Sequence, residues 1–323
     1  MPIFLISPDT PDAPGGVSQY WTRMVRAARA RGADIQWIPE AQWNPQRGNP
    51  ATDLLIVVNQ DVRKIPHPYA VVGVMHSSAM ENGLRTGNQY MFDMGRDQWE
   101  SAQRPRTYWV AVSPSTAFYC SRHMGVHADR IIPIGVDEAL VYPAERQARR
   151  DMPKPVVMHH CIDGNKGVDQ IGAVAAALGD AFLVRKLDCS PVSVGDALRM
   201  ADIWLCLSAD EGGPITVAEA MAAGLVVVTT DVGFVWSIAS GEAVQSRQRG
   251  AVAWANRDAG LVVFDWRLRG KPELVADFVR AAWDRRASLD PRPYALQHFG
   301  LDVFGQRWSD ALNLAASKMG VAL

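Results

Sequence analysis

The stretch DEGGPITVAEAMAAG, residues 210–224, predicts a glycine turn followed by an alanine-rich helix, and the apolar run LVVVTT at 225–230 predicts a strand after it. Pro214 is tolerated in the first turn of a helix, because the N–H that it lacks has no partner there. Gly212 and Gly213 then form a turn whose exposed N–H groups, together with the helix dipole, make a site for an anion. Phosphate is the natural ligand for such a site.

Two carboxylates, Glu211 and Glu219, flank this turn and the helix start. Because a phosphate repels a carboxylate, we expect both acids to accept hydrogen bonds from neutral hydroxyl groups, such as those of a sugar. A single glutamate in this position would ordinarily be a helix-start or surface acid. The whole string is more specific than a lone glycine-rich loop and favours a binding function.

An alternation of strand, glycine turn and helix extends from this stretch over the rest of the chain. Apolar runs predict further strands at 155–161, 181–187, 202–208 and 260–265 and, in the first half, at 1–7, 53–59, 69–76 and 108–113. Residues 17–28 have the spacing of an amphipathic helix, with Arg23, Arg26 and Arg29 opposite its apolar face. This alternation is typical of parallel sheets covered by helices, and it predicts an α/β fold of two doubly wound halves.

The composition is that of a globular protein with large cores. The 323 residues are 48% hydrophobic and 21% charged, and this length suggests about two domains. The net charge of -1 argues against a globally basic nucleic-acid binder, although most of the 33 basic residues are arginines that can form local anion sites.

The amino-terminal apolar run is too short for a signal peptide and no stretch reaches the roughly 18 apolar residues of a membrane span, so we expect a cytoplasmic protein. The cysteines form no CxxC and are expected to be reduced core thiols: Cys120, Cys161, Cys189 and Cys206.

Doubly wound sheets bind ligands at the carboxyl ends of their strands, so the residues that follow each strand are the candidates for a site. Lys166, in such a position, brings a flexible charge that can neutralise a diphosphate. His76 can hydrogen-bond a hydroxyl group, and Gly15 with Gly16 can let the backbone approach a ligand. A lone histidine or a Gly-Gly pair is more often structural, and a lone lysine is more often solvated.

These motifs together resemble a known family. EGGPITVAEAMAAG is similar to the E-x7-E signature of retaining GT-B glycosyltransferases of the family 4 type, with Glu211 and Glu219 at its two acids. Further stretches resemble landmarks of that family in the same order along most of the chain: PGGVSQYWTRMVRAARARGADI, HSSAMENG, VSPSTAFYCSRHMGVHADRIIPIGVDEALVYP and NKGVDQIGAVAAAL.

The resemblance implies a GT-B fold, in which two Rossmann-like doubly wound domains face a cleft. It implies an acceptor-side domain at 1–145, a nucleotide-sugar-binding domain at 146–300, and a helix at 301–323 that packs back on the first domain. The activity implied is that of a retaining, metal-independent hexosyltransferase with a UDP- or GDP-sugar donor and no other cofactor. Among acceptors we favour a glycan or a lipid-linked glycan over nucleic acid, and a peripheral membrane contact is left open.

The resemblance also implies residue roles. Glu211 and His76 would contact the donor sugar, Glu219 the ribose hydroxyls, and Lys166 the diphosphate. The phosphate side of the site would be formed by backbone at Gly15, Gly16, Gly212, Gly213, Pro214, Ile215 and Thr216. No DxD sequence occurs in the chain, which weakens a metal-dependent alternative.

One departure from the family pattern opens alternatives. The family has an arginine a few residues before the loop lysine, where this chain has His159 and His160. His160 could serve when protonated, or Arg185 could substitute from a neighbouring strand end. A metal site at these histidines is disfavoured, because adjacent residues of a strand point to opposite faces. The alternatives left open are a nucleotide-sugar-binding protein without transferase activity and a transferase acting on modified nucleic-acid bases.

Overall fold

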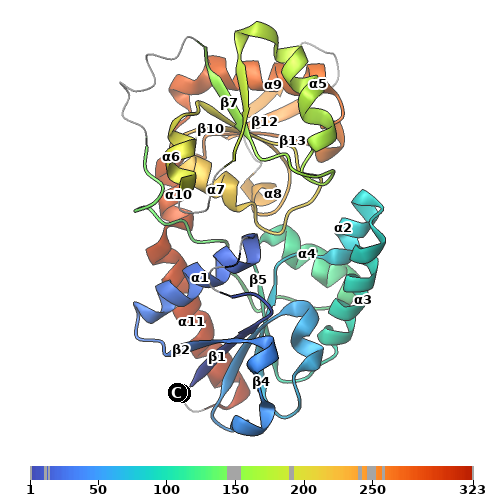
Figure 1. Ribbon diagram of the computed structural model, residues 1–323, viewed down its shortest axis with the longest axis vertical. Coiled ribbons are helices and arrows are strands. Elements are labelled where there is room, and N and C mark those ends of the chain that lie inside the picture. Colours follow the sequence, from blue (N-terminus) through green and yellow to red (C-terminus); the bar gives the residue numbers. More distant parts are fainter. Residues whose placement is uncertain are drawn as a thin grey trace. The chain divides into compact units, whose positions relative to one another are not determined.

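The computed structural model describes residues 2–10, 13, 15–143, 154–188, 193–238, 242–245, 252–256 and 259–321. The chain divides into two compact units, which are coloured along the sequence in Figure 1. The first unit comprises Met1–Gly135 with Leu301–Leu323, and the second comprises Val136–Gly300. Each unit is built around one largely parallel sheet, so each is described by itself.

The sheet of the first unit has six parallel strands in the order β2-β1-β3-β4-β5-β6. Their bounds are β1 Ile3–Ser7, β2 Ile35–Pro39, β3 Leu54–Val58, β4 Ala70–Met75, β5 Thr107–Ala111 and β6 Arg130–Ile131. Every residue of β3 and β4 is buried, as expected for inner strands that are covered on both faces. The sequence did not predict the edge strands β2 and β6, because neither has an uninterrupted apolar run.

The helices of the first unit are α1 Gly16–Arg29, α2 Ala79–Thr86, α3 Gln89–Ala102, α4 Pro114–Met124 and α11 Leu301–Met319. The carboxyl-terminal helix α11 packs against α1, as Figure 1 shows for the red and the blue helix. The ring of Tyr20 lies 5.3 Å from that of Phe304, edge to face. At Gly305 an added Cβ would lie 3.0 Å from the Cβ of Ala27, so the glycine permits this close approach. The last helix is therefore part of the first unit.

Helix α1 has the buried apolar face that its spacing predicts, but one of its arginines is misplaced in that prediction. Arg26 and Arg29 are exposed, whereas Arg23 is only 7% exposed. The Arg23 guanidinium donates a hydrogen bond of 2.8 Å to the carbonyl oxygen of Gly135. The expectation that Arg23 faces solvent is wrong, because the segment after β6 covers that side of the helix.

The sheet of the second unit has seven strands in the order β11-β12-β13-β10-β9-β7-β8. Their bounds are β7 Val156–His159, β8 Leu183–Lys186, β9 Ile203–Cys206, β10 Val226–Thr230, β11 Glu242–Gln245, β12 Val252–Asn256 and β13 Leu261–Phe264. The five strands from β13 to β8 are parallel, and β11 and β12 add an antiparallel hairpin at one edge. The apolar runs predicted the five parallel strands but not the hairpin.

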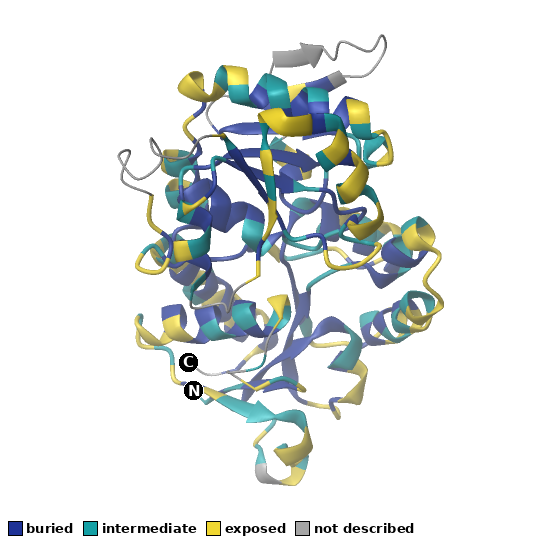
Figure 2. Ribbon diagram, turned by 45° about the horizontal axis from the view of Figure 1, so that its top comes forward, coloured by how far each residue is buried: buried dark blue, intermediate teal, exposed yellow. Residues whose placement is uncertain are grey.

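The helices of the second unit are α5 Val168–Leu178, α6 Val194–Arg199, α7 Ile215–Ala222, α8 Val235–Ile238, α9 Pro272–Arg285 and α10 Pro291–Phe299. In Figure 2 the inner parallel strands β7, β9, β10 and β13 are mostly dark blue, and the helices beside them carry yellow on their outer sides. Phe264 of β13 and Phe278 of α9 are fully buried, with ring centroids 5.3 Å apart. This core fixes the parallel strands, and their carboxyl ends position the loops that follow.

The division between the units falls between Gly135 and Val136, before the boundary at residue 145 that the sequence suggested. The N–H of Val136 donates to the carbonyl oxygen of Phe299 (2.6 Å), and Val136 also forms a parallel bridge with Gly300. Residues from 136 to 143 thus belong to the second unit. The predicted boundary itself falls within residues 144–153, which lie outside the described residues, as does Cys189. No helix in the described part of the chain has the length and apolar character that a bilayer crossing requires.

Candidate functional site

Two loops lie side by side at the carboxyl edge of the second sheet. The first, which we term the lysine loop, comprises residues 163–167 between β7 and α5. The second, the acid loop, comprises residues 207–214 between β9 and α7. Strands β7 and β9 are hydrogen-bonded neighbours in a parallel register, so their carboxyl ends deliver the two loops to one place.

Lys166 of the lysine loop and Glu211 of the acid loop form an ion pair, in which the Lys166 ammonium donates to Oε1 of Glu211. The hydroxyl of Ser208 donates to the same oxygen, at 2.8 Å. Burial by itself lowers the pKa of Lys166, but the charge and the hydrogen bond of Glu211 outweigh burial and raise the pKa overall. The site therefore holds a permanent cation whose charge is balanced by a carboxylate. These two side chains, predicted separately from the sequence, are brought into contact.

A small cavity lies beside this ion pair. It is lined by residues at the ends of β7 and β9, by both loops and by Thr216 in the first turn of α7. Its volume of about 10 Å³ has room for roughly one water molecule, so a larger ligand requires the side chains to move. The lining includes Lys166, Glu211 and His160 together with the thiol-bearing residues Cys161 and Cys206.

The start of α7 is open, with no side chain capping its first turn. Pro214 occupies the N-cap position, one residue before the helix, and Ile215 and Thr216 are the first two helical residues. Pro214 thus stands slightly earlier than predicted. Uncapped N–H groups of this kind favour an anion.

Gly212 and Gly213 make the turn without a positive φ angle. The glycine that shapes this turn is Gly233 in the segment after β10, with φ +60°. A Cβ at Gly233 would lie 2.4 Å from Cδ of Pro214, so only glycine fits there. Gly233 is not recognisable from the sequence alone, because its partner Pro214 comes from the loop of another strand and is not next to it in the chain.

Glu219 lies in the second turn of α7, and only 3% of the residue is exposed. It is not among the residues that line the cavity. Its predicted contact with a ribose therefore stays a prediction. A buried ionised carboxylate is costly unless it is hydrogen-bonded, which is consistent with a specific rather than a surface role.

Neither histidine at the end of β7 supplies the permanent cation that the arginine of the family pattern would provide. His160 lines the cavity and is partly buried; its burial, and next the positive charge of Lys166, lower its pKa. His159 is 7% exposed, its Nδ1 accepts a hydrogen bond from the N–H of Cys161, and burial lowers its pKa to about 4. Both imidazoles are uncharged at neutral pH.

The neighbouring strand β8 ends in two cations, Arg185 and Lys186. Arg185 is exposed and is paired in register with Met158, whereas Lys186 is paired with His159. The positive charge of Lys186 contributes to lowering the pKa of both histidines. The sequence pointed to Arg185 alone, whereas within β8 it is the charge of Lys186 that acts on the histidines at the end of β7.

The other predicted site residues belong to the first unit. Gly15 is the N-cap of α1, with φ 124° and ψ 160°, and Gly16 is the first residue of that helix, which has no side-chain cap. His76 directly follows β4, and its ring meets those of Tyr20 and Trp21 edge to face at 4.9 and 4.8 Å. Its Nε2 is buried without a hydrogen-bond partner, and burial lowers the pKa of His76 to about 3. His76 is a neutral imidazole with one unused polar atom.

Three of the four cysteines fall within the described residues, and all three are free thiols. Cys120 and Cys161 are buried, and burial raises the pKa of Cys161 to about 12. Over the same part of the chain, no group of three or more His, Cys, Asp or Glu side chains is arranged to hold a metal ion.

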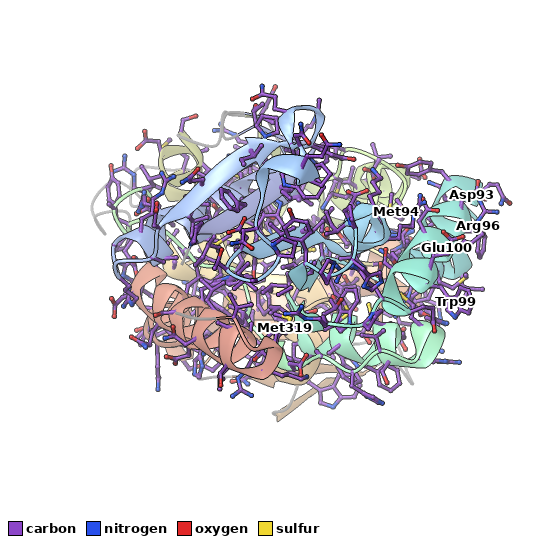
Figure 3. The ribbon with its side chains drawn as sticks, turned by 90° about the horizontal axis from the view of Figure 1, so that it is seen from below. Asp93, Met94, Arg96, Trp99, Glu100 and Met319 are labelled. Atoms are coloured by element: carbon purple, nitrogen blue, oxygen red, sulfur yellow. The ribbon has the colours of Figure 1, made fainter. Side chains whose placement is uncertain are left out.

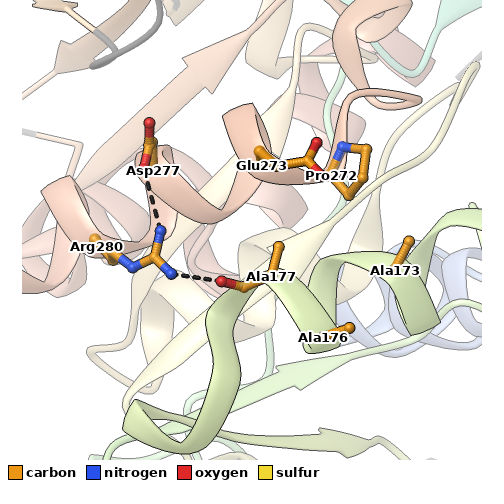
Figure 4. A pocket seen from close by; sticks show the side chains of 7 residues that line it. All are labelled: Ala173, Ala176, Ala177, Pro272, Glu273, Asp277 and Arg280. Carbon is orange, nitrogen blue, oxygen red and sulfur yellow. Dashed lines mark hydrogen bonds and ion pairs between the residues drawn. The ribbon is translucent and has the colours of Figure 1, made fainter.

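A larger cavity of about 640 Å³ lies between α5 and α9 (Figure 4). Three alanines of α5 form one side, and Glu273, Asp277 and Arg280 of α9 form the other. The Arg280 guanidinium bridges the Asp277 carboxylate (3.1 Å) and the carbonyl oxygen of Ala177 (2.5 Å), so this charged group serves to join the two helices. None of the predicted site residues lines this cavity.

Comparison with known proteins supports the architecture. Residues 186–253, which include the acid loop and α7, match the family described as glycosyl transferases group 1. No curated protein matches the sequence. Among solved structures, sucrose-phosphate synthase from Thermosynechococcus elongatus has a TM-score of 0.77 at 13% identity, covering 98% of this chain and 99% of that chain.

Two further structures are similar over nearly their whole length. Anabaena Alr3699/HepE in complex with UDP-glucose has a TM-score of 0.70 at 14% identity, covering 97% of this chain and 100% of that chain. WaaG, a glycosyltransferase involved in lipopolysaccharide biosynthesis, has a TM-score of 0.60 at 15% identity, covering 98% and 99%. The chain has the two-domain α/β fold of GT-B glycosyltransferase structures. The fold class predicted from the sequence is confirmed.

Proposed function

We propose that this chain is a retaining glycosyltransferase of the family 4 type, which transfers a hexosyl group from a UDP- or GDP-sugar without a metal ion. The observation that carries the proposal is the ion pair of Lys166 and Glu211 beside a cavity and beside the uncapped start of α7. A cation, an acceptor carboxylate and a helix N-terminus are the three groups that a diphosphate joined to a sugar requires.

Donor binding would exchange partners within this site. The diphosphate would take over the Lys166 ammonium, and a sugar hydroxyl would take over Glu211, so that each buried charge keeps a partner. The backbone N–H groups of Ile215 and Thr216 would face the phosphates, and Glu219 would hold the ribose hydroxyls. Charge that develops on the leaving diphosphate would then be stabilised by Lys166, where electrostatic catalysis is most effective. In this front-face reaction the leaving phosphate itself accepts the acceptor proton.

The comparisons support the proposal at a coarser level. The family match includes both acids of the E-x7-E string, and HepE was solved in complex with UDP-glucose, with UDP and glucose, and with UDP. WaaG is involved in lipopolysaccharide biosynthesis. We therefore propose a glycan or lipid-linked glycan as the acceptor, with His76, Gly15 and Gly16 in the first unit contacting the sugar and the phosphate side of the site.

Helix α3 of the first unit is relevant to the peripheral membrane contact that the sequence left open. Figure 3 shows the side chains of α3, where Asp93, Arg96 and Glu100 accompany Trp99. Trp99 is 51% exposed, and the charges around it are of both signs. Contact with a lipid-linked acceptor would therefore rest on aromatic insertion more than on a basic field. Flotation of the protein with vesicles of neutral and of anionic lipid tests this part of the proposal.

Calorimetric titration with UDP, GDP and ADP, followed by a donor-hydrolysis assay with the sugar nucleotides of the preferred base, tests the main proposal. We expect micromolar to millimolar affinity for one diphosphate and slow hydrolysis that depends on Lys166. If none of the three diphosphates binds, the proposal fails.

The uncharged His160 favours one second candidate, a nucleotide-sugar-binding protein that does not transfer sugar. Without a second permanent cation the leaving diphosphate would be stabilised less. In this case the donor binds, but neither hydrolysis nor transfer follows with any acceptor. The nucleic-acid alternative is weakened by the burial of Arg23, which leaves Arg26 and Arg29 as the exposed arginines of that helix face.

A further inference from the structure

Besides the ion pair of Lys166 and Glu211, the side chain of Asn165 joins the lysine loop to the acid loop. Its Nδ2 donates to the carbonyl oxygen of Asp210 (2.9 Å), and its Oδ1 accepts from the N–H of the same residue (3.1 Å). The carbonyl oxygen of Asn165 also accepts from the N–H of Ala209, at 2.7 Å. Asn165 thus extends the pairing of β7 and β9 beyond the ends of both strands.

A second side chain, that of Arg269, closes the same junction from the loop before α9. One nitrogen, Nη1, donates both to the carbonyl oxygen of Asn165 (2.7 Å) and to that of Leu207 (3.0 Å). Gly167 completes the contact: with φ +84°, it leaves so little room that a Cβ would lie 2.6 Å from Cβ of Leu207. The backbone on either side of Lys166 is therefore held against the backbone that precedes Glu211.

We infer that Asn165 and Arg269 are positioning residues, which hold the Lys166 ammonium and the Glu211 carboxylate in one place for the donor. This inference rests on the proposed function and deepens it. Lys166 and Glu211 are each the direct neighbour of a residue in the junction, so a shift of either loop moves a reacting group. Neither positioning residue lines the cavity beside the ion pair. Each acts through the backbone of the loops.

The chemistry of asparagine explains why this residue type stands here. A carboxamide supplies a donor and an acceptor in fixed geometry, which matches the C=O and N–H of a single peptide residue. Aspartate at this position keeps only the acceptor and turns a carboxylate oxygen toward the Asp210 carbonyl. Alanine loses both bonds and leaves two backbone groups without these partners.

Asn256 offers a matched control within the same unit. Its Nδ2 donates to the carbonyl oxygen of Ile238 (2.9 Å), and its Oδ1 accepts from the N–H of Ala259 (3.0 Å), so it makes the same pair of bonds to backbone. Asn256 is paired with Leu261 at the amino-terminal end of β13, whereas the two loops follow the carboxyl ends of the parallel strands. Asn165→Ala and Asn256→Ala therefore remove the same kind of bonds at and away from the site.

The experiment compares three variants, Asn165→Ala, Asn165→Asp and Asn256→Ala. Thermal stability, affinity for UDP and the rate of UDP-glucose hydrolysis are measured for each. If GDP is the preferred nucleotide, GDP replaces UDP and GDP-mannose replaces UDP-glucose. We expect similar losses of thermal stability in the two alanine variants. We expect Asn165→Ala alone to lower kcat by on the order of 10²-fold, as displacement of a reacting group by about 1 Å does, and to weaken diphosphate binding about tenfold. Asn165→Asp should lie between Asn165→Ala and the wild type in stability. If Asn165→Ala keeps the wild-type kcat and affinity, Asn165 is only structural and the inference is overturned.

Arg269→Ala, with Arg267→Ala as its control, tests the second positioning residue. The Arg267 side chain is 73% exposed and forms an ion pair with Asp265 of its own loop. Arg269→Ala should lower kcat more than tenfold, and Arg267→Ala should leave it unchanged. Equal behaviour of the two variants would contradict the inference for Arg269.

Amide hydrogen exchange separates a failure of this inference from a failure of the proposed function, because it needs no ligand. Exchange at Asp210, whose N–H donates to the Asn165 side chain, should accelerate in Asn165→Ala and stay slow in Asn256→Ala. Exchange at Ala209, whose N–H donates to the backbone carbonyl of Asn165, should accelerate with it because the loop is held less firmly. If wild type binds no nucleotide but exchange accelerates as expected, the junction exists and the proposed function is wrong. If exchange at both residues is unchanged, the junction does not hold the acid loop.

Discussion

The lysine loop of the second unit and the glycine turn of the first unit, Gly15 and Gly16 at the start of α1, are both proposed to face the phosphates of the donor, and they are built differently. Both come between a parallel strand and a helix without a side-chain cap. In the lysine loop the charge is on a side chain, and the backbone is held by the Arg269 side chain and by the backbone N–H of Ala209 in the acid loop. In the glycine turn, Gly15 adopts φ 124°, and a Cβ there would meet nothing within 4 Å. The lysine loop fixes a cation, whereas the start of α1 has no side-chain cap and has open space beside the Cα of Gly15.

The largest effect should come from removing the cation. Lys166→Ala should weaken binding of the free diphosphate and lower turnover together, by on the order of 10³-fold in kcat/KM, because the charge faces the diphosphate both before and during departure. Calorimetry and steady-state kinetics measure the two effects. Lys154→Ala is the control, since Lys154 of the same unit is half-exposed and pairs loosely with Asp180. If Lys166→Ala binds the diphosphate and turns over as the wild type does, the lysine loop has no role in donor binding or catalysis.

Glu211 should separate sugar recognition from nucleotide binding. Glu211→Ala should lower kcat with the sugar nucleotide by on the order of 10²-fold, because a preorganised contact at the reacting end is lost. Affinity for the free diphosphate should be unchanged or slightly higher, since Lys166 no longer has an ion-pair partner to give up. Weaker binding of the free diphosphate would show instead that Glu211 acts by orienting Lys166.

Glu219→Ala should have a smaller effect of a different kind. A ribose contact is lost equally from the ground state and the transition state, so KM should rise about tenfold for the sugar nucleotide while kcat changes little. Binding of the free diphosphate should weaken by the same factor. Because Glu219 is buried, Glu219→Gln serves as the control for folding. If Glu211→Ala and Glu219→Ala both behave as wild type, the E-x7-E string lies outside the active site.

Features that depend on residues close together in the chain could be predicted from the sequence, whereas features that depend on residues far apart in the chain could not. The runs VVMHH and IWLCL specify neighbouring buried strands, and the parallel sheet then brings Lys166 and Glu211 to one edge. The junction at Asn165 was not predictable, since its partners lie at Asp210 and Arg269, far away in the chain. The same holds for Gly233, whose closest neighbour is Cδ of Pro214, a residue far away in the chain. The burial of Arg23 depends on a backbone segment that packs over it from the end of the first unit.

The glycine turn should respond through backbone strain and not through charge. Gly15→Ala places a Cβ on a residue with φ 124° and ψ 160°, a region that is essentially restricted to glycine, and should cost about 1–3 kcal/mol of stability. Gly172→Ala, in the middle of α5 with open space around its Cα, should instead be stabilising by about 0.5–1 kcal/mol. Denaturant unfolding of both variants measures the difference. Equal stabilities would show that the turn relaxes easily and is not held in the glycine region.

His160→Arg should have the smallest effect on donor binding, and unlike the other substitutions at the site it should strengthen binding. Burial and the charge of Lys166 lower the pKa of His160 below its usual range, and Lys186, Glu211 and Asp163 are the other charged groups that act on it. The imidazole is therefore mostly neutral at pH 7 and becomes charged only as the pH falls below its ordinary pKa of about 6.5. Binding of UDP-glucose, whose diphosphate does not titrate in this range, should tighten in the wild type as the pH falls toward 5. His160→Arg carries the charge at every pH, so it should bind the donor several-fold more tightly at pH 7 and show no such pH dependence.

The stability of the wild type should change in the reverse direction: the unfolded chain takes up the proton first, so stability is fully present above about pH 6.5 and declines below it. If His160→Arg binds the donor no better than the wild type at pH 7, Lys186 at the end of β8 already supplies the second cation, and Lys186→Ala should then weaken binding where His160→Arg did not strengthen it.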